Sequence, residues 1–114
     1  SIKFYTEIFK MKLLRRKDYP DGKFTNVFLA YGDGSANTAL ELTHNWETDN
    51  YELGNAFGHI AIEVDDIYSF CGNLEANGAD VYRKPGPVKG GSTVIAFVRD
   101  PDGYAIELIQ NKNN

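Results

Sequence analysis

A short internal repeat constrains the fold of this chain more than any other feature. Shifting the sequence by 66 residues aligns residues 39–42 with residues 105–108, so that Ala-Leu-Glu-Leu meets Ala-Ile-Glu-Leu. Self-similarity at a fixed spacing is typical of a duplicated structural unit. Two apolar positions upstream of these segments also coincide, once one insertion or deletion is allowed: Phe4 with Phe70 and Ile8 with Leu74. We therefore expect two related modules that together form one domain.

The second module, residues 53–114, is predicted to run strand, helix, strand, strand, strand. Apolar and polar residues alternate over 59–64, which is typical of a half-buried strand. A helix is expected next, because N-cap candidates precede an apolar stripe and a glycine follows it. These residues are Asp65 and Asp66, then Ile67, Phe70 and Leu74, then Gly78. Strands are expected at about 80–83, 93–98 and 104–109, with turns at 86–91 and 100–103.

The first module, residues 1–52, shows the same order without an opening strand. Apolar residues recur at helical spacing within 1–10. Strands are then expected at 11–16, 24–31 and 38–43, and turns at 19–22 and 32–34. Because the chain begins at Ser1 within a helical pattern, we expect the missing strand in a segment that precedes it.

The repeat makes Glu41 and Glu107 equivalent, and each lies within a predicted strand between aliphatic residues. Glutamate is depleted in strand interiors, and a buried unpaired carboxylate normally neutralises, pairs or binds a metal. The alternative is that each side chain lies on the solvated face of a half-buried strand.

His59 begins the first strand of the second module, on the face that also carries Ala61. One imidazole and two carboxylates form a ligand set suited to Ni²⁺, Co²⁺, Mn²⁺ or Zn²⁺. The alternative is a structural histidine whose second nitrogen finds a backbone acceptor. The repeat places the counterpart of His59 before Ser1, so a fourth ligand is expected there.

Other candidates carry weaker signals. The glycine-rich stretch 86–91 lacks the ending of a phosphate-binding P-loop, so it is either a lid that presents Lys89 to an anion or a plain loop. Arg83 and Lys84 either contact a ligand carboxylate or are solvated. His44 is expected at the surface.

Net charge and cysteine content restrict the kinds of binding partner and the cellular compartment that we expect. The chain has 12 Lys and Arg against 16 Asp and Glu, a net charge of −4 with no basic run, which argues against nucleic acid and anionic membranes. The longest apolar run, 94–98, is far too short to span a bilayer. A lone Cys71 cannot form an internal disulfide, which fits a reducing compartment. We expect a cytoplasmic protein with a small-molecule ligand.

Several stretches resemble the glyoxalase I family of lactoylglutathione lyases, especially its short bacterial type, and the similarity covers nearly the whole chain. They are Ser-Ile-Lys-Phe-Tyr-Thr-Glu at 1–7, Ala-Leu-Glu-Leu-Thr-His-Asn-Trp at 39–46, Tyr-Glu-Leu-Gly at 51–54, Gly-His-Ile-Ala at 58–61, the stretch 86–91, and the run 93–108 with its Asp-Pro-Asp-Gly-Tyr.

The resemblance implies an α+β fold of paired βαβββ modules, the vicinal-oxygen-chelate architecture, with the first module lacking its opening strand. It also implies a homodimer with metal sites at the subunit interface. The implied ligands are Glu41, His59 and Glu107, with a fourth on the missing strand. The implied metal is Ni²⁺, with Co²⁺ or Zn²⁺ possible.

The implied reaction is isomerisation of the methylglyoxal–glutathione hemithioacetal to S-D-lactoylglutathione, without a redox cofactor. A divalent metal stabilises the enediolate that forms when C1 loses its proton. The resemblance assigns the base to Glu107, with Glu41 as its counterpart, and assigns glutathione contacts to Asn45 and Lys89. The alternatives are another metal-dependent enzyme of this fold and a non-enzymatic drug-binding module that needs no metal.

Overall fold

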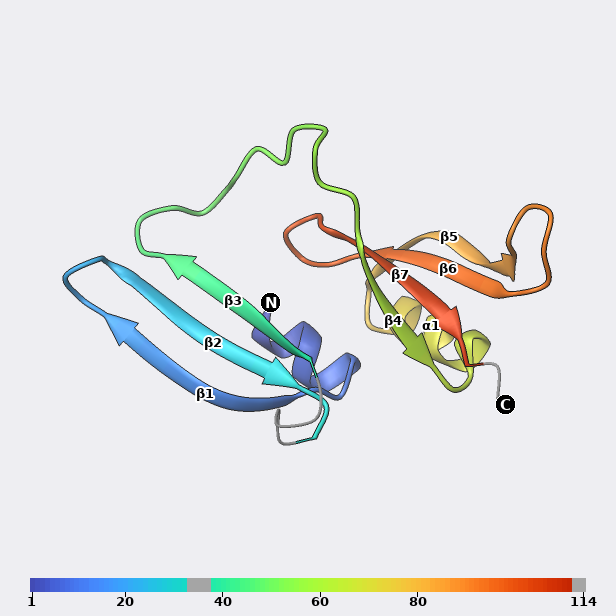
Figure 1. Ribbon diagram of the computed structural model, residues 1–114, viewed down its shortest axis with the longest axis horizontal. Helices are drawn as coiled ribbons and strands as arrows, with labels where there is room; N and C mark the ends of the chain where they lie inside the picture. The colour runs from blue at the N-terminus through green and yellow to red at the C-terminus, as the bar shows by residue number, and fades with distance from the viewer. Residues whose placement is uncertain (33–37, 112–114) are drawn as a thin grey trace. The chain divides into compact units, whose positions relative to one another are not determined.

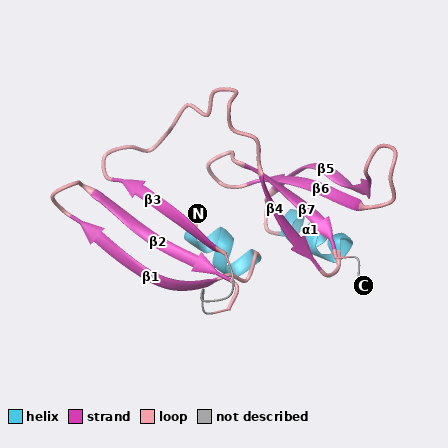
Figure 2. Ribbon diagram, in the orientation of Figure 1, coloured by secondary structure: helices cyan, strands magenta, loops and turns pink. Residues whose placement is uncertain are grey.

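The computed structural model describes residues 1–32 and 38–111. These residues form two compact units, Ser1–Glu52 and Leu53–Asn114 (Figure 1). Within the described part of the chain, each unit contains one helical element and one β-sheet (Figure 2), so the fold is α+β. No helix in the described ranges is long and apolar enough to cross a membrane.

The first unit is built from a helical turn and three strands. The π-helical turn η1 (Phe4–Ile8) is followed by β1 (Lys12–Tyr19), β2 (Phe24–Ala30) and β3 (Ala39–Asn45). Strand β2 lies in the middle and pairs antiparallel with both neighbours. The three predicted strands are confirmed, although β1 and β3 run further than expected. The helix expected over 1–10 is shorter, since the π-helical turn covers only Phe4–Ile8. Most of the turn predicted at 32–34 lies outside the described residues.

The second unit follows the predicted order of strand, helix and three strands. Its elements are β4 (Ile60–Val64), α1 (Ile67–Ala76), β5 (Asp80–Pro87), β6 (Val94–Arg99) and β7 (Ala105–Gln110). The sheet order β4-β7-β6-β5 brings the first and last strands together as a parallel pair, whereas the other two pairs are antiparallel. Strand β5 exceeds the predicted 80–83 because it continues through two irregularities in its pairing with β6.

One face of this sheet packs against α1, which contacts β5, β6 and β7. Along β7, Ile106 and Leu108 are completely buried, while Glu107 between them is not. The buried residues of α1 are Ile67, Cys71 and Leu74. The predicted buried stripe is therefore wrong at one position: Phe70 is only half-buried, and the buried residue next to it is Cys71. The spacing of the observed stripe matches one helical face because positions four and seven residues apart lie on the same side.

The ends of α1 are closed by side chains and by a glycine. The Asp66 carboxylate accepts a hydrogen bond from the Ser69 amide at 3.3 Å, which selects Asp66 over Asp65 as the N-cap. The Gln110 side-chain oxygen accepts from the Ile67 amide at 2.9 Å and so ties the helix start to β7. Past the other end, Gly78 has a φ of 79°, a backbone conformation that favours glycine.

Truncating Leu108 tests whether the helix-facing side of this sheet is a packed core. We expect Leu108→Ala to lower the free energy of unfolding by about 2–5 kcal/mol, because the change removes completely buried apolar volume. Urea denaturation measures the loss. Tyr68→Ala, which removes a large but exposed side chain, is the control and should stay within about 0.5 kcal/mol. Equal effects of the two variants would contradict this packing.

The N-cap of α1 predicts a pH dependence. Hydrogen bonds from the Ser69 hydroxyl and amide lower the pKa of Asp66 in the folded state. This contribution to stability is therefore complete above the unfolded pKa, about 3.9, and is lost as pH falls through the lower folded value. In urea unfolding below about pH 5, Asp66→Asn should lose less stability on acidification than the wild type. Asp21→Asn, which changes an exposed carboxyl in a turn, is the control and should follow the pH profile of the wild type. If the stability of Asp66→Asn fell with pH in parallel with that of the wild type, the proposed N-cap contribution would be contradicted.

Candidate active site

The second unit brings His59 and Glu107 into direct contact. The His59 Nε2 atom lies 3.1 Å from the Glu107 Oε1 atom. The parallel register explains this contact: Ala61 pairs with Glu107, and His59 lies two residues before Ala61. His59 itself was expected to begin this strand but immediately precedes it, since β4 starts at Ile60. The imidazole is 42% exposed and the carboxylate 18%. The two groups therefore sit at the edge of solvent rather than in the core.

An aromatic side chain borders this pair. Phe97 on β6 is the cross-strand partner of Glu107, on the side opposite Ala61. Its ring lies edge to face with the His59 ring, with centroids 5.3 Å apart and planes at 85°. This arrangement places apolar surface beside the imidazole and the carboxylate. The Phe97 ring also packs near the Tyr82 ring, with the two ring centroids 5.8 Å apart.

The chemistry of the pair suits either a hydrogen bond or a shared cation. An imidazole N–H can donate to a carboxylate at the observed separation. When Nε2 carries no proton, its lone pair and those of Oε1 can instead be directed at a metal ion. The structure thus places two donor atoms of the expected kinds side by side.

Glu41 lies on the open face of the first unit's sheet, where it is exposed. Directly opposite residues of an antiparallel pair share a face, so this face is described by three rows across β1, β2 and β3. The rows are Arg15–Phe28–Glu41, Lys17–Asn26–Thr43 and Tyr19–Phe24–Asn45.

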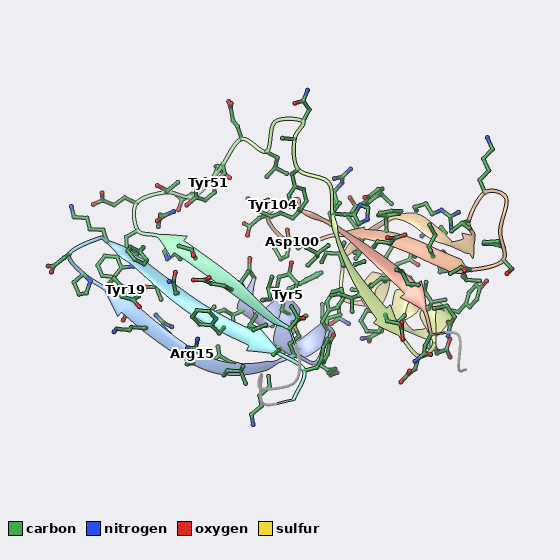
Figure 3. The ribbon with its side chains drawn as sticks, viewed as in Figure 1. Tyr5, Arg15, Tyr19, Tyr51, Asp100 and Tyr104 are labelled. Carbon is green, nitrogen blue, oxygen red and sulfur yellow. The ribbon has the colours of Figure 1, made fainter. Side chains whose placement is uncertain are left out.

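The β1 edge of this face carries two cations on aromatic rings. The Arg15 guanidinium lies 4.0 Å from the centroid of the Phe28 ring, and the Lys17 ammonium lies 5.1 Å from that of Tyr19. Figure 3 shows Arg15 and Tyr19 along this strand. Contacts of this kind hold cations in place against a sheet surface.

The three predicted metal ligands are thus divided between the units. His59 and Glu107 meet in the second unit, and Glu41 belongs to the first. Among residues 1–32 and 38–111, no three His, Cys, Asp or Glu side chains gather closely enough to hold a metal ion.

The two predicted glutathione contacts also belong to different units. The Asn45 side-chain amide donates to the Tyr51 hydroxyl at 2.7 Å, and both side chains are exposed. Lys89 is exposed in the turn between β5 and β6, and within the described chain its ammonium makes no hydrogen bond or ion pair. His44 is exposed, as expected.

Arg83 and Lys84 have partners other than those considered from the sequence. The Arg83 guanidinium donates to four backbone carbonyls, and the Lys84 ammonium pairs with the Glu75 carboxylate. Arg83 is therefore neither simply solvated nor available to a ligand carboxylate.

Three residues beside the proposed ligands, Arg15, Lys17 and Phe97, were not predicted from the sequence. A period of two along β1 would have placed Arg15, Lys17 and Tyr19 on one face of that strand. Only the strand register shows that this is the face of Glu41, and only the register places Phe97 beside Glu107.

A family model and individual relatives of known proteins point to the same family. The model of the Glyoxalase/Bleomycin resistance protein/Dioxygenase superfamily matches residues 1–108. The lactoylglutathione lyase of Neisseria meningitidis is 59% identical over 113 residues, which cover 99% of this chain and 82% of the relative.

Solved structures agree with this result. Glyoxalase I from Zea mays matches with a TM-score of 0.92 and 56% identity, over 96% of this chain but only 39% of the maize chain. This chain therefore spans well under half the length of that protein. The trypanothione-dependent glyoxalase I of Leishmania major matches with a TM-score of 0.88 and 42% identity, over 99% of this chain and 78% of that one. On these matches, the chain belongs to the Glyoxalase/Bleomycin resistance protein/Dioxygenase superfamily.

Proposed function

We propose that this chain is a lactoylglutathione lyase, an enzyme that isomerises the hemithioacetal of methylglyoxal and glutathione to S-D-lactoylglutathione. The similarity to relatives of that name, 59% identity over 99% of the chain, supports the activity. The observation that supports the site is the contact of His59 with Glu107 at 3.1 Å, since it joins a metal-ligand imidazole to a carboxylate that can also act as a base.

The donor atoms fit a divalent cation. We propose that His59 and Glu107, together with Glu41, hold Ni²⁺, with Co²⁺ and Zn²⁺ as alternatives; nitrogen and oxygen donors suit all three. A cation held there supplies Lewis-acid stabilisation of the negative charge that develops on the substrate oxygens when carbon loses its proton.

Glu107 is the proposed base. It removes the proton from C1 of the hemithioacetal and returns it to C2, so the reaction is a net isomerisation and needs no oxidant or reductant. Ala61 and Phe97 flank Glu107 in the sheet, and only 18% of its side chain is exposed. Limited water access keeps the abstracted proton on the carboxylate until C2 accepts it. Glu41 is its counterpart in the first unit.

The remaining parts of the proposal concern the glutathione moiety, assembly and location. The Asn45 amide and the Lys89 ammonium bind the peptide and carboxylate groups of glutathione. On the resemblance to the glyoxalase I family, we propose a homodimer with its metal sites at the subunit interface. A cytoplasmic location agrees with the single cysteine, Cys71, which is buried and unpaired by any disulfide.

Removing the base tests the activity. Glu107→Gln in the full-length protein should lower kcat for the hemithioacetal by at least about 100-fold, because an amide cannot accept the C1 proton. Thioester formation, followed by absorbance, measures the rate. Glu63→Gln, an exposed glutamate on the neighbouring strand β4, is the matched control and should leave kcat unchanged. A Glu107→Gln enzyme that keeps its activity would contradict the role of Glu107 as the base. A wild type that is inactive with every metal would contradict the proposed lyase activity.

Removing the imidazole tests the metal site. In calorimetric titrations of the full-length protein with Ni²⁺, Co²⁺ and Zn²⁺, His59→Ala should weaken binding by more than about tenfold, since even loss of groups that only support a ligand costs this much. His44→Ala changes the chain's other histidine, which is exposed on β3, and should bind metal as the wild type does. Metal affinity that survives in His59→Ala would contradict His59 as a ligand, whereas ligand binding that is unchanged without metal would favour the drug-binding module.

A further inference from the structure

We propose that Arg83 is a positioning residue: it holds the turn between β5 and β6 in one conformation and so presents Lys89 to the carboxylate of a peptide thiol. The role of Lys89 rests on the proposed function, whereas the contacts of Arg83 stand on the structure alone.

The Arg83 guanidinium binds backbone oxygens on both sides of the turn. Its Nη1 atom, which carries two hydrogens, lies within hydrogen-bond distance of three carbonyl oxygens, those of Gly86 and Ile95 at 2.9 Å and that of Lys84 at 3.0 Å. Its Nη2 atom donates to the Pro87 carbonyl at 3.0 Å. One side chain thus joins the end of β5 to the start of β6.

These carbonyls lie where the pairing of β5 with β6 is irregular. The register of β5 against β6 shifts between Val81 and Arg83 and again between Arg83 and Gly86. Within the described residues, strand β5 is at the edge of its sheet and pairs only with β6. The Arg83 side chain adds hydrogen bonds to the backbone of this irregular edge.

The turn held by Arg83 has a defined backbone of its own. The Val88 amide donates to the Thr93 carbonyl at 2.8 Å, and the Gly91 amide donates to the Val88 carbonyl at 3.1 Å. Gly90 has a φ of 80°, which favours glycine, and a Cβ atom on Gly91 would lie 2.8 Å from a Val88 methyl carbon. The backbone is therefore an ordered turn at the tip of a hairpin, not an unstructured loop.

Lys89 lies in this turn between Val88 and Gly90. In the described part of the chain, its ammonium is a free cation on an ordered support. A cation on a fixed backbone loses less conformational freedom when it binds an anion than one on a mobile loop. This is the physical link from Arg83 to substrate binding.

The geometry requires arginine rather than any cation. The guanidinium fork directs donors from two nitrogens at fixed angles, whereas the lysine ammonium directs its three donors from one point. Lysine at position 83 keeps the charge but cannot reach carbonyls on both sides of the turn. Arg83→Lys and Arg83→Gln are therefore expected to behave alike.

Hydrogen exchange tests the structural part of the proposal. In the full-length protein, Arg83→Lys and Arg83→Gln should each accelerate exchange of the Val88 and Gly91 amides by at least about tenfold, with exchange in α1 unchanged. Arg99→Lys is the control, because Arg99 is exposed on the neighbouring strand and its contacts, with Asp80, Tyr82 and Gly103, do not include the turn. Unchanged exchange at the turn in both Arg83 variants would overturn the proposal.

A double-mutant cycle tests the link to binding. Lys89→Ala and Arg83→Gln should each raise KM for the hemithioacetal by about two- to fivefold with kcat unchanged, the range for an exposed ion pair. Because Arg83 acts through Lys89, the double variant should be no worse than Lys89→Ala alone. Effects that multiply, or a KM insensitive to Lys89→Ala, would overturn the positioning role. Failure of the proposed function is seen separately, as a wild type that does not turn over the hemithioacetal.

Discussion

Alternation of side chains along each strand is the constraint on which this structure depends. A strand sends successive side chains to opposite faces, and in each unit only one face becomes the core. In β7 this rule buries Ile106 and Leu108 and leaves Glu107 between them on the other face. In β3 it exposes Glu41 between two half-buried leucines. The alternation that buries the aliphatic side chains in each core therefore also keeps the two carboxylates out of it.

The parallel pairing of β4 with β7 brings the Glu107 carboxylate beside His59 in the proposed metal site. A parallel pair requires a crossover connection, which here consists of α1, β5 and β6. Bonds at the end of this pair reinforce it: the Gln110 side chain caps α1, and the Asn111 amide donates to the Val64 carbonyl at 2.7 Å. Closing the unit therefore places His59 against Glu107. At the edge of the sheet, the Arg83 side chain binds backbone carbonyls of both β5 and its neighbour β6.

Much of this architecture could be predicted from local patterns. Alternation over 59–64 and the repeat of the Glu-centred tetrapeptide predicted which residues of β4, β3 and β7 share a face. The N-cap was narrowed to two aspartates, and the choice of Asp66 depends on the hydrogen bond from Ser69. Phe70 was expected on the buried stripe but is only half-buried, because side-chain hydrophobicity alone does not fix how a helix is rotated against its sheet.

The sequence by itself determined the order of the elements, the faces of the strands and the residue types able to bind a metal and move a proton, because these follow from periodicity and side-chain chemistry within a few residues. Only the tertiary structure decided that His59 touches Glu107, that Phe97 borders them, that Arg15 and Lys17 share the face of Glu41, and that Arg83 is occupied by backbone carbonyls. The physical reason is that these contacts depend on strand register and sheet order, which arise when distant segments pair and leave no local trace in the sequence.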